Sequence, residues 1–174
     1  LRASVHLRFG KLYEERLLLP GRAITQYKQA LDLDPSLIPA ITAAREIYLG
    51  SNKLEAAADM YELEIAATPE LADRHGLLVA LASHRQELLG DLDGAVLALR
   101  RALKALPKDP TTLALLARLL HQRAKDTVGE SADADRSRAA ELYYQVARSV
   151  PRGLAQPYLV ACIELRPEHP RAAI

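Results

Sequence analysis

The apolar positions of this 174-residue chain repeat with the spacing of a helix face that ends at a proline. A small residue is followed four positions later by a large one, then by a second small residue, and then by a proline. The stretch from Ala57 to Pro69 shows this order with Tyr61 as the large residue, although Glu64 stands where the second small residue is expected. Spacings of three and four place such side chains on one side of an α-helix. The proline favours the end of that helix.

The same face recurs along the chain. One copy begins upstream at Ala23, and two further copies begin downstream at Ala95 and Ala140. Each is preceded by another amphipathic helix, and a period of about 34 residues made of two helices predicts a helical repeat protein. The helix pairs are expected at residues 3–35, 37–69, 71–107 and 110–151, with a partial repeat at 154–166.

Two of the expected repeats carry insertions. The third is longer by close to one helical turn, and such an addition keeps the same face pointing inward. In the fourth, residues 125–138 are polar and acidic, which predicts a surface loop before a helix over 137–150.

The helix from about 154 to 165 is apolar on nearly all sides. We therefore expect either further repeats or another chain to cover it.

Composition excludes several classes of function. The net charge is +1 with acids and bases interspersed, which argues against a nucleic-acid groove. No apolar run approaches the roughly 20 residues of a membrane span. Cys162 is the single cysteine, so an intrachain disulfide and a Cys-based zinc site are excluded, and a buried apolar role is expected for it.

The sequence leaves the localisation open. The chain begins at Leu1 and not at a methionine, which predicts a piece of a longer protein. A signal peptide could have been removed upstream, so the periplasm is an alternative to the favoured cytoplasm.

No catalytic or metal-binding arrangement is recognisable. His6 and His75 occupy the same packed position in two repeats, which favours a structural role. His84 and His121 have no carboxylate or cysteine nearby in the pattern that would complete a metal site. Sequence motifs of phosphate loops, nucleophile elbows and zinc proteases are absent. We predict a non-catalytic protein without a cofactor or a metal.

Four stretches match one known repeat signature: FGKLY at 9–13, AITQYKQALDLDP at 23–35, AAADMYELEIAATP at 56–69 and GDLDGAVLALRRALKALP at 90–107. Through them the chain resembles the tetratricopeptide repeat family, whose unit is two antiparallel helices in about 34 residues. It is most similar to the long irregular arrays of large bacterial scaffold proteins. Arg45 and Val79 depart from the pattern, because they replace the small residue seen at Gly10.

The resemblance implies an all-α fold, a right-handed α-solenoid of about four helix pairs with one extra C-terminal helix, in a single domain over residues 1–174. It also implies a protein–protein interaction scaffold, part of a multiprotein assembly, whose first helices line a concave groove for a protein or peptide partner. A clamp for C-terminal carboxylates is not expected, because only Lys11 offers a cation at the corresponding positions. The expected groove residues are Leu7, Lys11, Glu14, Thr42, Glu46, Leu49, Asp73, Ala80, His84, Arg118, His121 and Gln122.

Two alternatives stay open at this point. The apolar C-terminal helix could mediate a homodimer, with Tyr158, Leu159 and Cys162 as its interface. The chain could instead be a regulatory segment of a larger multidomain protein.

Overall fold

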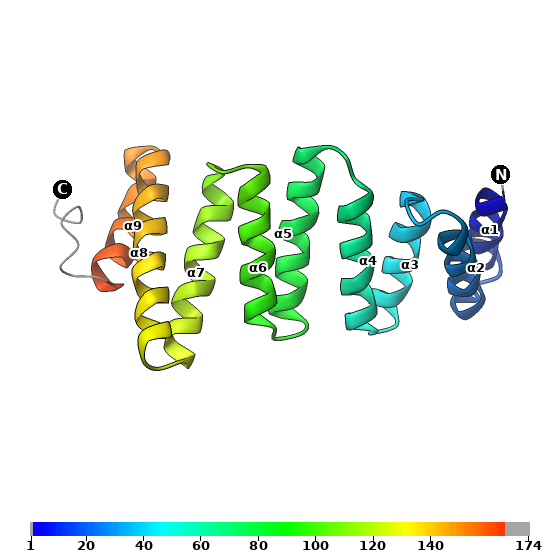
Figure 1. Cartoon of the computed structure of the whole chain (residues 1–174), viewed down its shortest axis with the longest axis horizontal. Coiled ribbons are helices and arrows are strands. Elements are labelled where there is room, and N and C mark those ends of the chain that lie inside the picture. Colours follow the sequence, from blue (N-terminus) through cyan, green and yellow to red (C-terminus); the bar gives the residue numbers. More distant parts are fainter. Residues whose placement is uncertain (1, 166–174) are drawn as a thin grey trace. The chain divides into compact units, whose positions relative to one another are not determined.

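The computed structural model describes residues 2–165, and every regular element in that range is a helix (Figure 1). Within each of the two units described below, successive helices run antiparallel and pack on one another, and the predicted all-α class is confirmed. The chain divides into two compact units, residues 1–90 and 91–174. A single domain over residues 1–174 stays a prediction. None of the helices within residues 2–165 is long and apolar enough to cross a membrane.

The first unit is held together by small and aromatic residues on the predicted helix faces. Ala23, Tyr27 and Ala57 are fully buried, and they belong to one core cluster with Ala40 and Ala44. Small residues let helix backbones approach, while the tyrosine ring fills the space between them. The helices are α1 (Arg2–Lys11), the π-helical η1 (Leu12–Arg16), α2 (Pro20–Leu33), α3 (Ile38–Gly50), α4 (Leu54–Ala67) and α5 (Leu71–Glu87).

Arg45 and Glu64, which both depart from the repeat signature, contact each other in this unit. Arg45 Nε on α3 lies 3.2 Å from Glu64 Oε2 on α4, and both side chains are largely buried. The Arg45 guanidinium also lies 4.4 Å from the centre of the Tyr61 ring, and the Thr42 hydroxyl donates to Glu64 Oε1 at 2.8 Å. Among the described residues, Arg45 Nε and Glu64 Oε2 have no hydrogen-bond partner. Their mutual ion pair therefore compensates two charges that neither helix could bury alone.

We expect these two residues to be energetically coupled. Replacing Arg45 by alanine leaves the buried Glu64 carboxylate without an ion-pair partner, and replacing Glu64 leaves Arg45 with only the exposed carboxylate of Glu46 at 3.3 Å. Replacing both restores the small residues typical of the repeat. A double-mutant cycle on R45A, E64A and R45A/E64A should give a coupling energy of about 1–2 kcal/mol in urea unfolding. Additive effects of the two single substitutions would contradict this interpretation.

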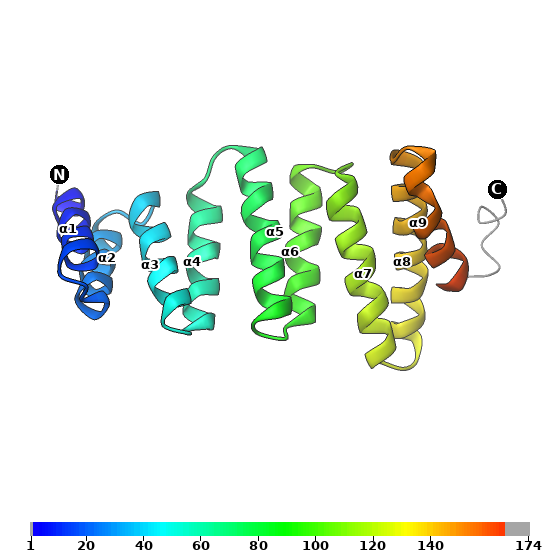
Figure 2. The same ribbon diagram turned by 180° about the vertical axis from the view of Figure 1, so that it is seen from behind.

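The second unit contains α6 (Leu92–Ala105), α7 (Pro110–Asp126), α8 (Glu130–Ser149) and α9 (Arg152–Leu165). Each helix packs on the next, as Figure 2 shows from behind. The predicted loop over residues 125–138 is wrong, because α7 continues to Asp126 and α8 already begins at Glu130. Gly129 makes the short turn between them with a φ of +89°, a conformation that suits glycine.

The early start of α8 has a tertiary cause. Ala132 and Asp135 lie in the segment expected to be solvated, yet both are buried. Arg123 of α7 donates from Nε to Asp135 Oδ2 at 2.6 Å and from a terminal nitrogen to Asp135 Oδ1 at 2.8 Å. This bidentate interaction between the Arg123 guanidinium and the buried Asp135 carboxylate fixes the first turns of α8 against α7.

Candidate functional site

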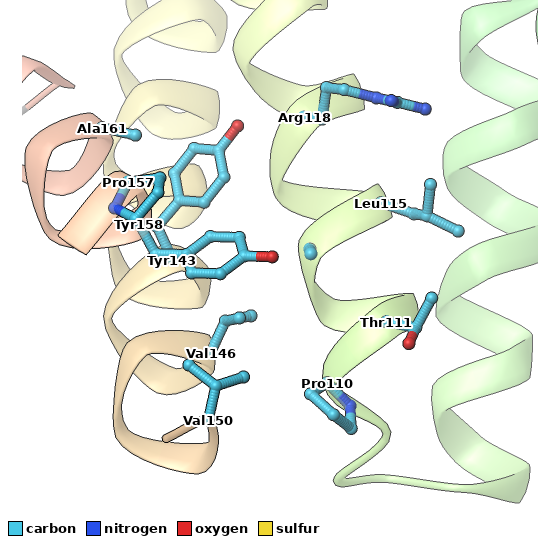
Figure 3. Close-up of a pocket in the computed structure, with 11 residues that line it drawn as sticks. Pro110, Thr111, Leu115, Arg118, Tyr143, Val146, Val150, Pro157, Tyr158 and Ala161 are labelled. Carbon is cyan, nitrogen blue, oxygen red and sulfur yellow. The ribbon is translucent and has the colours of Figure 1, made fainter. Parts of the chain in front are cut away.

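A pocket of about 460 Å³ lies in the second unit between α7, α8 and α9 (Figure 3). Its walls are mainly apolar, and its polar side chains are those of one threonine, two tyrosines and one arginine. The lining residues are Pro110, Thr111, Ala114, Leu115 and Arg118 of α7, Tyr143, Val146 and Val150 at α8 and its end, and Pro157, Tyr158 and Ala161 of α9.

The wall on the α7 side begins at a well-defined helix start. Asp109 caps α7, because its carboxylate accepts from the Thr112 backbone N–H at 2.7 Å and from the Thr112 hydroxyl at 2.7 Å. Pro110 is the first residue of the helix, where the missing N–H is not needed. From this start, spacings of three and four bring Thr111, Ala114 and Arg118 to the pocket.

The opposite wall is built around two tyrosines. The rings of Tyr143 on α8 and Tyr158 on α9 have centroids 6.3 Å apart and are tilted by 31°. Such an offset pair is favourable for aromatic rings. Beside it, Pro157 lies inside α9 and brings no backbone N–H to the helix. The result is a wall of rings against α7.

The polar groups of the pocket differ in their surroundings. Burial raises the pKa of Tyr143, the nearby Tyr158 adds to this, and the charge of Arg118 opposes it. The Tyr143 hydroxyl is therefore protonated at neutral pH and can both donate and accept. Arg118 is exposed, and in Figure 3 its side chain points away from the two rings. It places a positive charge at the edge of the pocket.

These groups are suited to binding. The pocket has no nucleophile paired with a base among its lining residues. Within residues 2–165, no group of three or more His, Cys, Asp or Glu side chains is placed to hold a metal ion. Apolar walls with three hydroxyls and one cation can accept an apolar side chain together with a carbonyl or carboxylate.

Comparison with known proteins agrees with this architecture. No protein-family model matches the chain, and no curated protein matches it either. Among solved structures, the C-terminal part of a TPR repeat-containing protein from Cytophaga hutchinsonii is 15% identical and superposes with a TM-score of 0.55, covering 99% of this chain and 72% of that one. The chain has the tetratricopeptide repeat fold. The MamA protein is similar too, with 14% identity, a TM-score of 0.52, and coverage of 94% of this chain and 91% of its own.

In a tetratricopeptide repeat fold, α7 and α9 are the first helices of successive pairs. The pocket therefore lies between two first helices, and residues of α8 form its base. Arg118 is one of the residues predicted for the groove, and it lines this pocket. Gln122 is exposed on α7. His121 is half-buried, and its pKa is lowered by burial and by Lys125, with Glu164 opposing.

The other predicted groove residues belong to the first unit. Two of them already have polar partners, since Glu14 accepts from the Tyr27 hydroxyl at 2.5 Å and Thr42 donates to Glu64. The exposed ones are Lys11, Glu46 and Asp73, and the half-buried ones are Leu7, Glu14, Thr42, Leu49 and Ala80.

The last of this set, His84, does not have the position expected of it. Its side chain is only 5% exposed, and its Nε2 lies 2.8 Å from the Leu54 carbonyl oxygen. Its ring also contacts Tyr61, with centroids 5.7 Å apart. His84 joins α5 to α4 in the interior, so we leave it out of any binding surface.

The three residues expected at a C-terminal interface differ in their burial and in their contact with the pocket. Cys162 is fully buried, in agreement with the apolar role expected for it, so it is not available to another chain. Burial and the charge of Glu141 raise the pKa of its thiol. Tyr158 lines the pocket, and Leu159 is half-buried.

Sequence reasoning missed Tyr143, Val146 and Pro157 as pocket residues. The prediction considered only first helices, whereas Tyr143 and Val146 lie on the second helix of their pair. A signal for Pro157 was present, because a proline within the expected helix and beside an aromatic residue marks a stiff surface.

Proposed function

We propose that this chain is a non-catalytic interaction module that takes a segment of a partner protein into the pocket between α7, α8 and α9. The single observation that supports the proposal is the pocket itself, with its apolar walls, paired tyrosine rings and one cation at the edge. An extended segment with an apolar side chain next to a carboxylate matches these groups. A role within a multiprotein assembly follows from the same proposal.

Selection of peptides from a phage-displayed random library on the wild-type protein tests this function. Ala114 is a half-buried lining residue, and Ala114→Arg should fill the pocket. Fluorescence anisotropy should show at least about tenfold weaker binding of the selected peptides, equivalent to about 1.4 kcal/mol. Ala134→Arg, at an exposed position of α8, is the matched control and should bind normally.

Equal binding to Ala114→Arg, or failure to select any peptide, would refute the proposal. The alternative function is self-association through α9, favoured by the exposed side chains of Leu154, Val160 and Ile163. Light scattering over a range of protein concentrations distinguishes the two. A dimer abolished by Ile163→Asp would transfer the functional surface to α9.

A further inference from the structure

The polar side chains of the pocket between α7, α8 and α9 have unused hydrogen-bonding capacity. The Tyr143 side chain is only 9% exposed, yet its hydroxyl forms no hydrogen bond with another residue of the described range. The same holds there for the side chains of Tyr158, Thr111 and Arg118. A tyrosine buried to this extent usually has a hydrogen-bond partner. The pocket thus presents several donors to whatever enters it.

These donors are matched to a ligand that mainly accepts hydrogen bonds. No lining side chain is a carboxylate, a carboxamide or an imidazole, so none of them is dedicated to accepting. An ordinary extended segment brings one backbone N–H with each carbonyl, and an N–H that is buried without an acceptor costs free energy. Proline brings the carbonyl without the N–H. The pocket therefore favours a proline-rich segment over other extended segments.

The wall of rings favours the same ligand. Tyr143 and Tyr158 have ring centroids 6.3 Å apart, and Figure 3 shows the two rings side by side with Pro157 next to them. Proline-rich segments bind grooves lined by aromatic rings, because their polyproline II conformation is formed before binding and little entropy is lost. This conformation has no internal hydrogen bonds, so its carbonyls are free to accept from the hydroxyls of the wall.

Charge distinguishes the possible sources of such a segment. Arg118 places a positive charge at the edge of the pocket, and no lining residue is acidic. Residues 166–171 of the chain itself read RPEHPR, with two prolines but with two arginines against one glutamate. Their net positive charge opposes that of Arg118, whereas a partner segment with a carboxylate beside its prolines is attracted by it. An acidic, proline-rich segment of a partner is therefore the better match.

From these observations we infer that the partner segment bound in the pocket is proline-rich, adopts the polyproline II conformation and carries a carboxylate next to its prolines. Its prolines pack on the Tyr143 and Tyr158 rings, one of its carbonyls accepts from the Tyr143 hydroxyl, and the carboxylate pairs with Arg118. This inference rests on the proposed function and specifies the ligand of the same pocket.

Fluorescence anisotropy with a fluorescein-labelled peptide of sequence PPPEPPP tests the inference. The peptide AAAEAAA keeps the charge but adds backbone N–H groups, and it should bind at least about tenfold more weakly. Tyr143→Phe keeps the ring and removes the hydroxyl, so it should weaken binding of PPPEPPP about fivefold. Its urea midpoint should equal that of the wild type, because the hydroxyl has no partner among the described residues. Tyr144→Phe is the matched control on the same helix, does not line the pocket, and should bind normally.

Two further variants test the charge and the source of the segment. Arg118→Gln should weaken binding of PPPEPPP about fivefold and leave binding of PPPQPPP unchanged. The double variant Pro167→Ala/Pro170→Ala should bind PPPEPPP like the wild type. Tighter binding to it would mean that the chain's own segment competes for the pocket, and would overturn the assignment to a partner.

The outcomes separate this inference from the proposed function. Equal binding of PPPEPPP and AAAEAAA, or of PPPEPPP to Tyr143→Phe and to the wild type, would overturn the inference. If library-selected peptides still bound the wild type and were lost in Ala114→Arg, the proposed function would stand without it. If no peptide bound the wild type, both would be overturned.

Discussion

Replacing Arg123 by alanine is expected to destabilise the second unit by about 3 kcal/mol. Asp135 is 6% exposed, and Arg123 is its two-pronged partner at 2.6 and 2.8 Å. The same guanidinium also donates to Asp93 of α6 at 2.6 Å, so one side chain joins three helices. These bonds raise the pKa of Arg123 further above its usual value, although its partial burial opposes them. Without Arg123, the Asp135 carboxylate would stay buried and unpaired, and α8 would lose the contact that fixes its first turns.

The measurement is urea unfolding followed by circular dichroism. The matched control is Arg136→Ala, because Arg136 pairs with Asp133 at 2.5 Å on the exposed side of the same helix. A solvent-exposed pair contributes only about 0–1 kcal/mol, so this variant should unfold close to the wild type. Similar losses in both variants would show that the burial of Asp135 is unimportant. Hydrogen exchange should also rise in residues 130–136 of Arg123→Ala before it rises elsewhere in α8.

Periodicity predicted the helix faces because it is a local property of the sequence. The small and large positions marked by Ala23, Tyr27 and Ala57 are fully buried, and the helices they belong to pack as antiparallel pairs. Which side of a helix is apolar depends only on spacing. The all-α class and the repeat fold could therefore be predicted without a structure.

The start of α8 could not be predicted in this way. Residues 130–136 are mostly polar, and their composition is typical of a loop. They are helical because Asp135 pairs with an arginine twelve positions earlier in the chain, on another helix. The Arg45–Glu64 pair poses the same difficulty, because each residue by itself only departs from the small residue that the repeat signature expects at its position. Only their proximity across two helices shows that they compensate one another.

The candidate site was predictable only in part, for the same reason. Arg118 was expected in the groove because it lies on a first helix, and it does line the pocket. Tyr143 was not expected, because the distance between α7 and α9 decides how much of α8 is accessible between them. The position of His84 depends on a backbone carbonyl of a neighbouring helix, which no spacing along α5 reveals.

Replacing each of two glycines of the first unit separately by alanine should change the stability of that unit in opposite directions. A Cβ atom on Gly10 would stand 2.5 Å from Cδ1 of Tyr27 and closer still to Cε1. That ring is fully buried, and its hydroxyl donates to Glu14, so it has little room to move. We expect Gly10→Ala to cost about 2–3 kcal/mol by overpacking. This cost exceeds the roughly 1 kcal/mol that alanine gains over glycine inside a helix.

Gly76 provides the matched control because it lies inside α5, and a Cβ atom added there would meet no heavy atom within 4 Å. There only the helix preference acts, and Gly76→Ala should stabilise the unit by about 1 kcal/mol. Urea midpoints that move in opposite directions would establish that Gly10 is selected by the Tyr27 ring. If both variants were stabilised, α1 would have to shift away from α2 at little cost, and the close packing of this pair would not be a source of stability. A Gly10→Ala/Tyr27→Leu double variant separates these cases, since removing the ring should relieve the clash and make the alanine favourable.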